Sequence, residues 1–171
     1  MDYFGDGQQF GVELQYVFEE QPLGTAGSLS LLRTSDEPML VINGDIITDV
    51  DYLAMLAYHR EHRAEMTVGV RTFDLEVPYG VLECDGSHVR SIQEKPAVHL
   101  LVNAGIYLLE PNTHRHVPNA EAFDMTDLIK VLLGDNKTVV SFPVYEYWAD
   151  VGHPDTYEQL RNGRKSGDFR S

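Results

Sequence analysis

Two aspartates far apart in the sequence each follow an apolar, strand-like run. Asp45 ends the run VINGD (residues 41–45), and Asp150 ends the aromatic run EYWAD (residues 146–150). The carboxyl ends of strands in α/β sheets are where ligands bind. Two carboxylates from distant segments, completed by substrate phosphates, are a usual way to hold Mg²⁺. The two positions therefore fit a shared magnesium site, and the alternative for Asp45 is a turn aspartate that caps the next helix.

A lysine at the end of one predicted strand and a glycine inside another are not explained by strand formation alone. Lys95 lies in EKP, where the proline stiffens the exit from a strand, and an acidic protein needs a cation to bind an anionic ligand. Gly105 lies inside the apolar run VNAGIYLL, and glycine weakens a strand unless another group approaches the backbone closely. Both residues are candidates for ligand contact.

No residue is placed as a covalent nucleophile. No serine or cysteine lies in a nucleophile-elbow context, and Cys84 has no basic neighbour to activate it. His59 and His62 have helical spacing but no third ligand nearby, which favours a solvated helix face. Covalent catalysis therefore has no visible candidate in the sequence.

The composition narrows the class of partner. Thirteen basic against 27 acidic side chains give a net charge of −14, which argues against nucleic acid and anionic membranes as partners. No apolar run is long enough to span a bilayer, and the N-terminus lacks the features of a signal peptide. A single cysteine suits a reducing compartment. We expect a cytoplasmic protein.

Strand-like and helix-like runs alternate along most of the chain, which indicates an α/β fold with a largely parallel sheet. Between 66 and 109 there is no room for helices, so part of the sheet is expected to be mixed or to carry a hairpin. The organisation is one domain over 1–161 and a polar tail over 162–171. Strands are predicted at 12–18, 39–43, 66–71, 79–84, 88–94, 101–109 and 138–142, and helices at 26–33, 52–63, 125–133 and 155–162.

Helix starts are marked by aspartates. Asp51 and Asp124 are predicted to be N-caps, the second with Asp127 at the capping-box spacing. Asp49 is expected to be a turn residue.

Six short motifs occur in one order along the chain: LGTAGSL, NGD, VPYGVLECDG, EKP, VNAGIYLLEP and YWADVG. In this order the chain resembles the sugar-1-phosphate nucleotidyltransferases, or nucleotide-sugar pyrophosphorylases. It is most similar to their mannose-1-phosphate guanylyltransferase-like branch, including members linked to CBS domains. The resemblance extends from about Tyr3 to Leu160. It implies a Rossmann-like nucleotide-diphospho-sugar transferase fold with a mixed central sheet.

The resemblance also implies an activity. Members transfer a nucleotidyl group from an NTP to a sugar 1-phosphate and release pyrophosphate, with no covalent enzyme intermediate. The cofactor is Mg²⁺, held by Asp45 and Asp150, and Lys95 contacts the sugar phosphate. The implied sugar-binding residues are Tyr79, Gly80, Glu94, Asn103 and Gly105; the implied nucleotide-binding residues are Glu19, Leu23, Gly24, Thr25 and Gly44.

The LGTAG turn looks like a phosphate-binding turn but has no basic residue. By resemblance it holds the nucleobase, with Glu19 at the position that reads the base. Guanine presents two donors, N1–H and N2–H₂, side by side, and one carboxylate accepts both. The expected nucleotide is therefore GTP. The sugar is left open, since a hexosamine, mannose or heptose phosphate would fit.

The chain departs from the family pattern at its start. The glycine-rich loop with an arginine that grips the NTP phosphates is not found in these residues. The chain therefore resembles an N-terminally truncated domain that lacks the first strands and is inactive alone. Residues 39–43 should then have an unpaired edge, and 12–18 should either move beside 39–43 or pair across a homo-oligomer.

Two alternatives remain. One is a glycosyltransferase of related fold, with Asp49-Val50-Asp51 as its metal motif. The other is a non-catalytic subunit that binds a sugar nucleotide for regulation, which the missing loop favours.

Overall fold

The computed structural model describes residues 3–32, 36–152, 156–158 and 161. Its centre is a four-stranded sheet in the order β1-β6-β3-β7. The strands are β1 (Met39–Ile42), β3 (Met66–Glu76), β6 (Ala97–Leu109) and β7 (Val139–Pro143). β6 runs antiparallel to β1 and β3, whereas β3 and β7 are parallel. The predicted α/β fold with a mixed sheet is confirmed, but the expectation of a largely parallel sheet is wrong, because two of the three pairings in this sheet are antiparallel.

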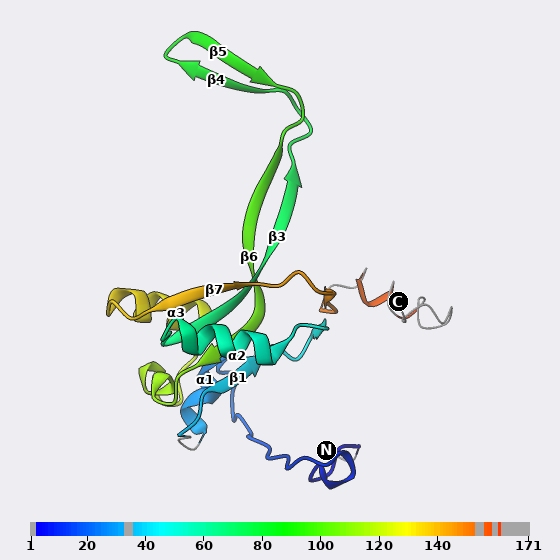
Figure 1. Cartoon of the computed structure of the whole chain (residues 1–171), viewed down its shortest axis with the longest axis vertical. Helices are drawn as coiled ribbons and strands as arrows, with labels where there is room; N and C mark the ends of the chain where they lie inside the picture. The colour runs from blue at the N-terminus through cyan, green and yellow to red at the C-terminus, as the bar shows by residue number, and fades with distance from the viewer. Residues whose placement is uncertain (1–2, 33–35, 153–155, 159–160, 162–171) are drawn as a thin grey trace.

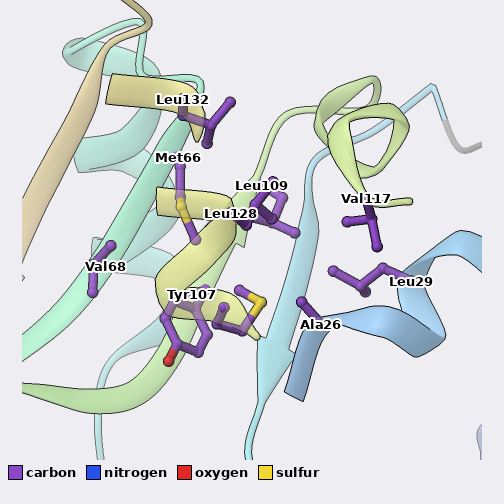
Figure 2. Packing of buried hydrophobic residues seen from close by; sticks show 10 residues of the cluster. Ala26, Leu29, Met66, Val68, Tyr107, Leu109, Val117, Leu128 and Leu132 are labelled. Atoms are coloured by element: carbon purple, nitrogen blue, oxygen red, sulfur yellow. The ribbon is translucent and has the colours of Figure 1, made fainter. Parts of the chain in front are cut away.

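Helices cover both faces of this sheet because the buried half of β6 sends alternate side chains to opposite faces. Tyr107 and Leu109 pack into one cluster, which also includes Leu128 of α3 (Met125–Gly134). Figure 2 shows this cluster, with Ala26 and Leu29 joining from the start of the chain. The second cluster lies on the other face, against α2 (Tyr52–Glu61), and its members are Val50, Met55, Ala104, Ile106, Leu108 and Val144.

Beyond the body, β3 and β6 continue together as a two-stranded ribbon (Figure 1). A second hairpin, β4 (Val81–Asp85) with β5 (His88–Gln93), lies at its far end. The hairpin predicted within residues 66–109 is confirmed. Most side chains of this ribbon and hairpin are exposed, including apolar ones such as Phe73 and Ile92.

The predicted strand 12–18 is wrong. All of these residues except the half-buried Leu14 are exposed, and they form no ladder in the part of the chain that the structure describes. Alternation of apolar and polar residues favours a strand only where a neighbouring strand supplies hydrogen bonds and a surface to cover. β1 pairs only with β6 among the described strands, so its outer edge is open, as predicted. Residues 12–18 have not moved beside it, and pairing across an oligomer stays a prediction.

The helix predictions hold in part. α2 and α3 are confirmed within one or two residues, but the helix expected at 26–33 is a short α1 (Gly24–Gly27) followed by a 3₁₀ turn at Ser28–Leu31. Further 3₁₀ turns lie at Gln8–Phe10 and Thr113–His116. Much of the predicted 155–162 helix lies outside the described residues. None of the helices in the described residues is long and apolar enough to cross a membrane.

Asp51 caps α2 as predicted, because its side chain accepts hydrogen bonds from the Leu53 and Ala54 amides. The capping box at Asp124 and Asp127 is wrong. Asp124 is the N-cap residue of α3, as predicted, but its side chain makes no hydrogen bond to that helix, and Asp127 instead binds Lys130 Nζ at 2.8 Å.

Candidate functional site

Two three-residue strands that the sequence did not reveal bring the predicted metal ligands together. β2 (Ile46–Thr48) and β8 (Trp148–Asp150) pair antiparallel, with Ile46 opposite Asp150. The ladder continues one step further, where the Val151 amide donates to the Asp45 carbonyl at 2.8 Å. Asp45 therefore lies next to Asp150, although the two are far apart in the sequence.

Gly152 shows how closely the two carboxylates approach. An ideal Cβ on this glycine would lie 2.8 Å from Asp45 Oδ2 and 3.0 Å from Asp150 Oδ1. The Gly152 amide also donates to Asp150 Oδ1 at 2.9 Å. Two hard carboxylate oxygens around one small space fit Mg²⁺. The described residues contain no group of three or more His, Cys, Asp or Glu able to hold a metal.

A bulge in β6 lies beside this pair. Val68 and Val70 of β3 pair with Tyr107 and Asn103, so β6 passes three residues where β3 passes one. Gly105, in the bulge, has φ +71°, and an ideal Cβ there would lie 2.8 Å from Asn43 Nδ2. The Asn43 amide donates to the Gly105 carbonyl at 2.9 Å. The close backbone approach predicted at Gly105 is thus made by a side chain of the protein itself.

The side chain of Asn103 braces the bulge. Its Oδ1 accepts from the Gly105 amide at 2.9 Å, and its Nδ2 donates to the Tyr107 hydroxyl at 2.8 Å. Burial raises the pKa of Tyr107, and the hydrogen bond from Asn103 offsets a smaller part of that rise. A sugar hydroxyl would have to share these groups with the bulge.

Sequence reasoning missed two residues of this region. Trp148 donates from Nε1 to the Ala104 carbonyl of the bulge at 2.8 Å. Arg71 donates to the Trp148 carbonyl at 3.1 Å, and its guanidinium lies 4.9 Å from the centre of the Trp148 ring. The available signals were an arginine in the otherwise uncharged run TVGVRTF and the one tryptophan of the chain two positions before Asp150.

The predicted nucleotide-binding residues gather at the LGTAG turn. Glu19 Oε2 accepts from the Leu23 amide at 3.0 Å, and both residues line a cavity of about 480 Å³. Gly24 has φ +75°, and an ideal Cβ there would lie 2.7 Å from Asp124 Oδ1. Thr25 binds that same oxygen through its amide at 2.9 Å. The turn therefore packs closely against the start of α3. This contact alone explains why residue 24 is a glycine. Gly44, between β1 and Asp45, has open space around it.

The remaining predicted sugar residues form a second group at the base of the β4–β5 hairpin. The Lys95 amide donates to the Tyr79 carbonyl at 3.3 Å, and an ideal Cβ on Gly80 would lie 3.1 Å from Glu94 Oε2. Tyr79 is 74% exposed.

The structure does not bring this second group to the aspartates. Six positions of β6 separate Ala97 from Asn103, roughly 20 Å at about 3.3 Å per residue, and Lys95 lies beyond Ala97. Figure 1 shows the ribbon continuing away from the body over this length. Asn103 and Gly105 lie with the aspartate pair; Tyr79, Gly80, Glu94 and Lys95 lie at the other end of the ribbon.

The sequence was compared with models of known protein families. The family model described as nucleotidyl transferase matches residues 1–166. The chain belongs to the nucleotidyl transferase family. The chain is 31% identical to a UTP–glucose-1-phosphate uridylyltransferase of Synechocystis, over 93% of the chain and 47% of the relative. It is also 31% identical to a mannose-1-phosphate guanyltransferase of Candida albicans, over 88% of the chain and 44% of the relative.

Solved structures agree on the fold of this chain. A protein assigned as a glucose-1-phosphate thymidylyltransferase from Bacillus anthracis matches with a TM-score of 0.71 and 22% identity, over 99% of the chain and 72% of that protein. HddC from Yersinia pseudotuberculosis, complexed with GMP-PN, matches with a TM-score of 0.61 and 24% identity, over 92% and 72% respectively. The chain spans less than half the length of the two sequence relatives.

Proposed function

We propose that the protein containing this chain transfers a nucleotidyl group from an NTP to a sugar 1-phosphate, releasing pyrophosphate, in nucleotide-sugar biosynthesis. The observation that carries the proposal is the convergence of Asp45 and Asp150 on Gly152. Its sequence relatives include a uridylyltransferase and a guanyltransferase, both named for sugar 1-phosphates. The shared reaction class supports the activity but leaves the base open.

In the proposed reaction, the two carboxylates hold Mg²⁺, which would offset the charge of the reacting phosphates. Asp45 and Asp150 approach from a turn after β1 and from the end of β8, so the β2–β8 ladder fixes their separation. Gly152 keeps the space between them clear of a side chain. The proposed reaction has no covalent enzyme intermediate, and the protein orients the sugar phosphate for in-line attack on the α-phosphorus.

The sugar contacts form a separate part of the proposal. Lys95 is assigned to the sugar phosphate, and Tyr79, Gly80 and Glu94 to the sugar, with Asn103 and Gly105 on the body side. Because the two groups lie at opposite ends of the ribbon, we expect the ribbon to bend toward the body when substrate is bound. In that case Lys95→Ala raises KM for the sugar phosphate, whereas Arg90→Ala at the hairpin tip does not. Equal KM values for both variants and the unmodified protein would count against the assignment.

GTP is the proposed nucleotide. Glu19 places a carboxylate in the cavity beside the LGTAG turn, and a carboxylate matches the two adjacent donors of guanine. Glu19→Gln in the complete gene product should weaken GTP use by about 1–3 kcal/mol, the scale of a lost charged hydrogen bond. Glu20→Gln, which alters the same cavity, is the matched control. Equal use of GTP and UTP by the unmodified protein would contradict guanine selection.

The reaction is tested by pyrophosphate release from the complete gene product with Mg²⁺, a panel of NTPs and a panel of sugar 1-phosphates. We expect Asp45→Asn and Asp150→Asn to abolish turnover, and Asp49→Asn to retain it. The opposite pattern would favour a glycosyltransferase with a metal motif at 49–51. Against that reading, the Asp51 carboxylate already caps α2.

The 171 residues alone are expected to show little turnover, since they contain no glycine-rich loop with an arginine to hold a triphosphate. Robust pyrophosphate release by the purified chain would overturn this expectation.

We further propose a cytoplasmic location, because the exposed thiol of Cys84 suits a reducing compartment.

A further inference from the structure

Arg71 joins three elements next to the aspartate pair. It extends from β3, donates to the Trp148 carbonyl at 3.1 Å, and lies over the Trp148 ring at 4.9 Å. The Trp148 indole in turn donates to the Ala104 carbonyl in the β6 bulge at 2.8 Å. Trp148 is half-buried against the cluster under α2. A chain of contacts therefore runs from β3 through β8 to β6.

The carbonyl that Arg71 binds is one that the β2–β8 ladder does not use. Tyr147 accepts from the Asp49 amide, and the Val151 amide donates to Asp45, so the odd-numbered positions of this segment face β2. In an antiparallel pair the intervening residues direct their backbone groups to the other side. Trp148 thus presents its carbonyl away from β2, toward β3, and Arg71 supplies the donor. The three-residue β8 is held on its free side by this contact.

We propose that Arg71 is a positioning residue for the metal site: it holds Trp148, and through it β8, so that Asp150 stays opposite Asp45. This inference rests on the proposed function, because it takes the aspartate pair to bind a divalent cation. Such a short ladder has few backbone bonds to fix Asp150, whereas a planar guanidinium both donates and stacks. A lysine ammonium has neither the forked N–H donors of a guanidinium nor a planar group that can stack on the indole.

The proposal and simple electrostatics predict opposite changes in cation affinity when Arg71 is replaced. Removing a positive charge near a cation site should strengthen cation binding if charge were the only effect. Loss of a group that orients a ligand should weaken binding, by about 10- to 100-fold for comparable supporting contacts. Arg71→Met therefore separates the two explanations by the direction of the change.

The test uses the 171-residue chain and its one tryptophan. Tb³⁺, a luminescent probe for oxygen-ligand cation sites, is titrated while Trp148 is excited, so that sensitised emission reports binding close to the indole. The variants are Arg71→Met, Arg71→Lys and Asp150→Asn, with Arg90→Met as the matched control because Arg90 lies on the distant hairpin. In parallel, hydrogen exchange of the single indole N–H is followed by NMR. Circular dichroism verifies that each variant keeps its fold.

We expect Arg71→Met to weaken Tb³⁺ binding about 10- to 100-fold and to accelerate indole exchange. Arg71→Lys should be intermediate, and Arg90→Met unchanged. Unchanged indole exchange in Arg71→Met would overturn the contact between the two residues. Faster exchange with unchanged or tighter Tb³⁺ binding would overturn the positioning role.

The two proposals fail differently. If the unmodified chain and Asp150→Asn bind Tb³⁺ equally, or neither binds, the metal site itself is overturned, and the positioning role with it. If Asp150→Asn loses binding but Arg71→Met does not, the metal site stands and only the role of Arg71 is overturned.

Discussion

Asn43 and Gly105 hold the end of β1 against the bulge of β6. The Asn43 amide donates to the Gly105 carbonyl at 2.9 Å, and the Asn43 side chain fills the space where a Cβ on Gly105 would lie. Asp45 follows Asn43 by two residues. The position of one metal-binding candidate therefore depends on a glycine about 60 residues away in sequence.

Replacement of that glycine should destabilise the fold. Gly105→Ala forces a left-handed residue to carry a Cβ 2.8 Å from Asn43 Nδ2, so we expect a loss of about 1–3 kcal/mol in the free energy of unfolding. Urea unfolding followed by Trp148 fluorescence measures it. Gly86→Ala is the control, since Gly86 also has positive φ but nothing near its would-be Cβ. If Gly86→Ala costs as much, backbone strain alone explains the effect.

Gly152→Ala should act on metal binding rather than on stability. The atoms that its Cβ would meet are the carboxylate ends of Asp45 and Asp150, which can rotate away at little cost. We expect Tb³⁺ affinity to fall about tenfold or more, while the unfolding midpoint stays near that of the unmodified chain. Gly134→Ala, in open space at the end of α3, is the matched control. Unchanged Tb³⁺ affinity would mean that the ion does not sit between these two side chains.

Thr25 provides a tertiary cap for α3. Its Oγ1 accepts from the Met125 amide at 2.9 Å and donates to Asp124 Oδ1 at 3.2 Å. Thr25→Val keeps the shape but removes both bonds, and should cost about 1–2 kcal/mol, as for the loss of an N-cap. Thr72→Val on the exposed ribbon makes the same atomic change away from any helix. Equal unfolding free energies for the two variants would exclude the cap.

Alkaline pH should weaken the fold through Tyr107. Burial raises the pKa of this phenol, so the folded chain keeps its proton at a pH where the unfolded chain, with a pKa of about 10, has lost it. Stability is therefore unaffected by this group below about pH 10 and falls as the pH rises through the folded pKa. Urea unfolding at several pH values up to 11 should show a shallower fall for Tyr107→Phe. Burial also raises the pKa of Tyr52, so some slope remains.

Tyr79→Phe is the control for that measurement, because Tyr79 is 74% exposed. It should leave the pH dependence as it is in the unmodified chain. A Tyr107→Phe curve parallel to that of the unmodified chain would show that Tyr107 ionises equally easily in both states.

The sequence predicted those elements whose signal is local. Apolar runs marked β1, β6 and β7, and Asp51 marked the start of α2. Asp124 occupies the N-cap position of α3, but its side chain binds Thr25, about 100 residues earlier, instead of the helix. A partner so distant leaves no local pattern.

The candidate site shows the same limit. Asp45 and Asp150 were found from their places after apolar runs, but β2 and β8, which bring them together, are three residues each and exist only as a pair. Arg71 was missed because its partner is a backbone carbonyl, which every residue has. The separation of Lys95 from the aspartates follows from the length of the ribbon, which the sequence does not state.

The burial of β6 changes abruptly along its length. Ala104–Leu109 is buried throughout, whereas Ala97–Asn103 is largely exposed and, among the described strands, pairs only with β3. The hydrogen bonds make β6 one continuous strand. Its two halves, which meet at the bulge, should nevertheless differ in their stability against local unfolding. The ribbon should therefore open by local unfolding while the body remains folded. Amide protection along this strand would then rise in a single step between Asn103 and Ile106, and the residues proposed to contact the sugar would belong to the less stable unit.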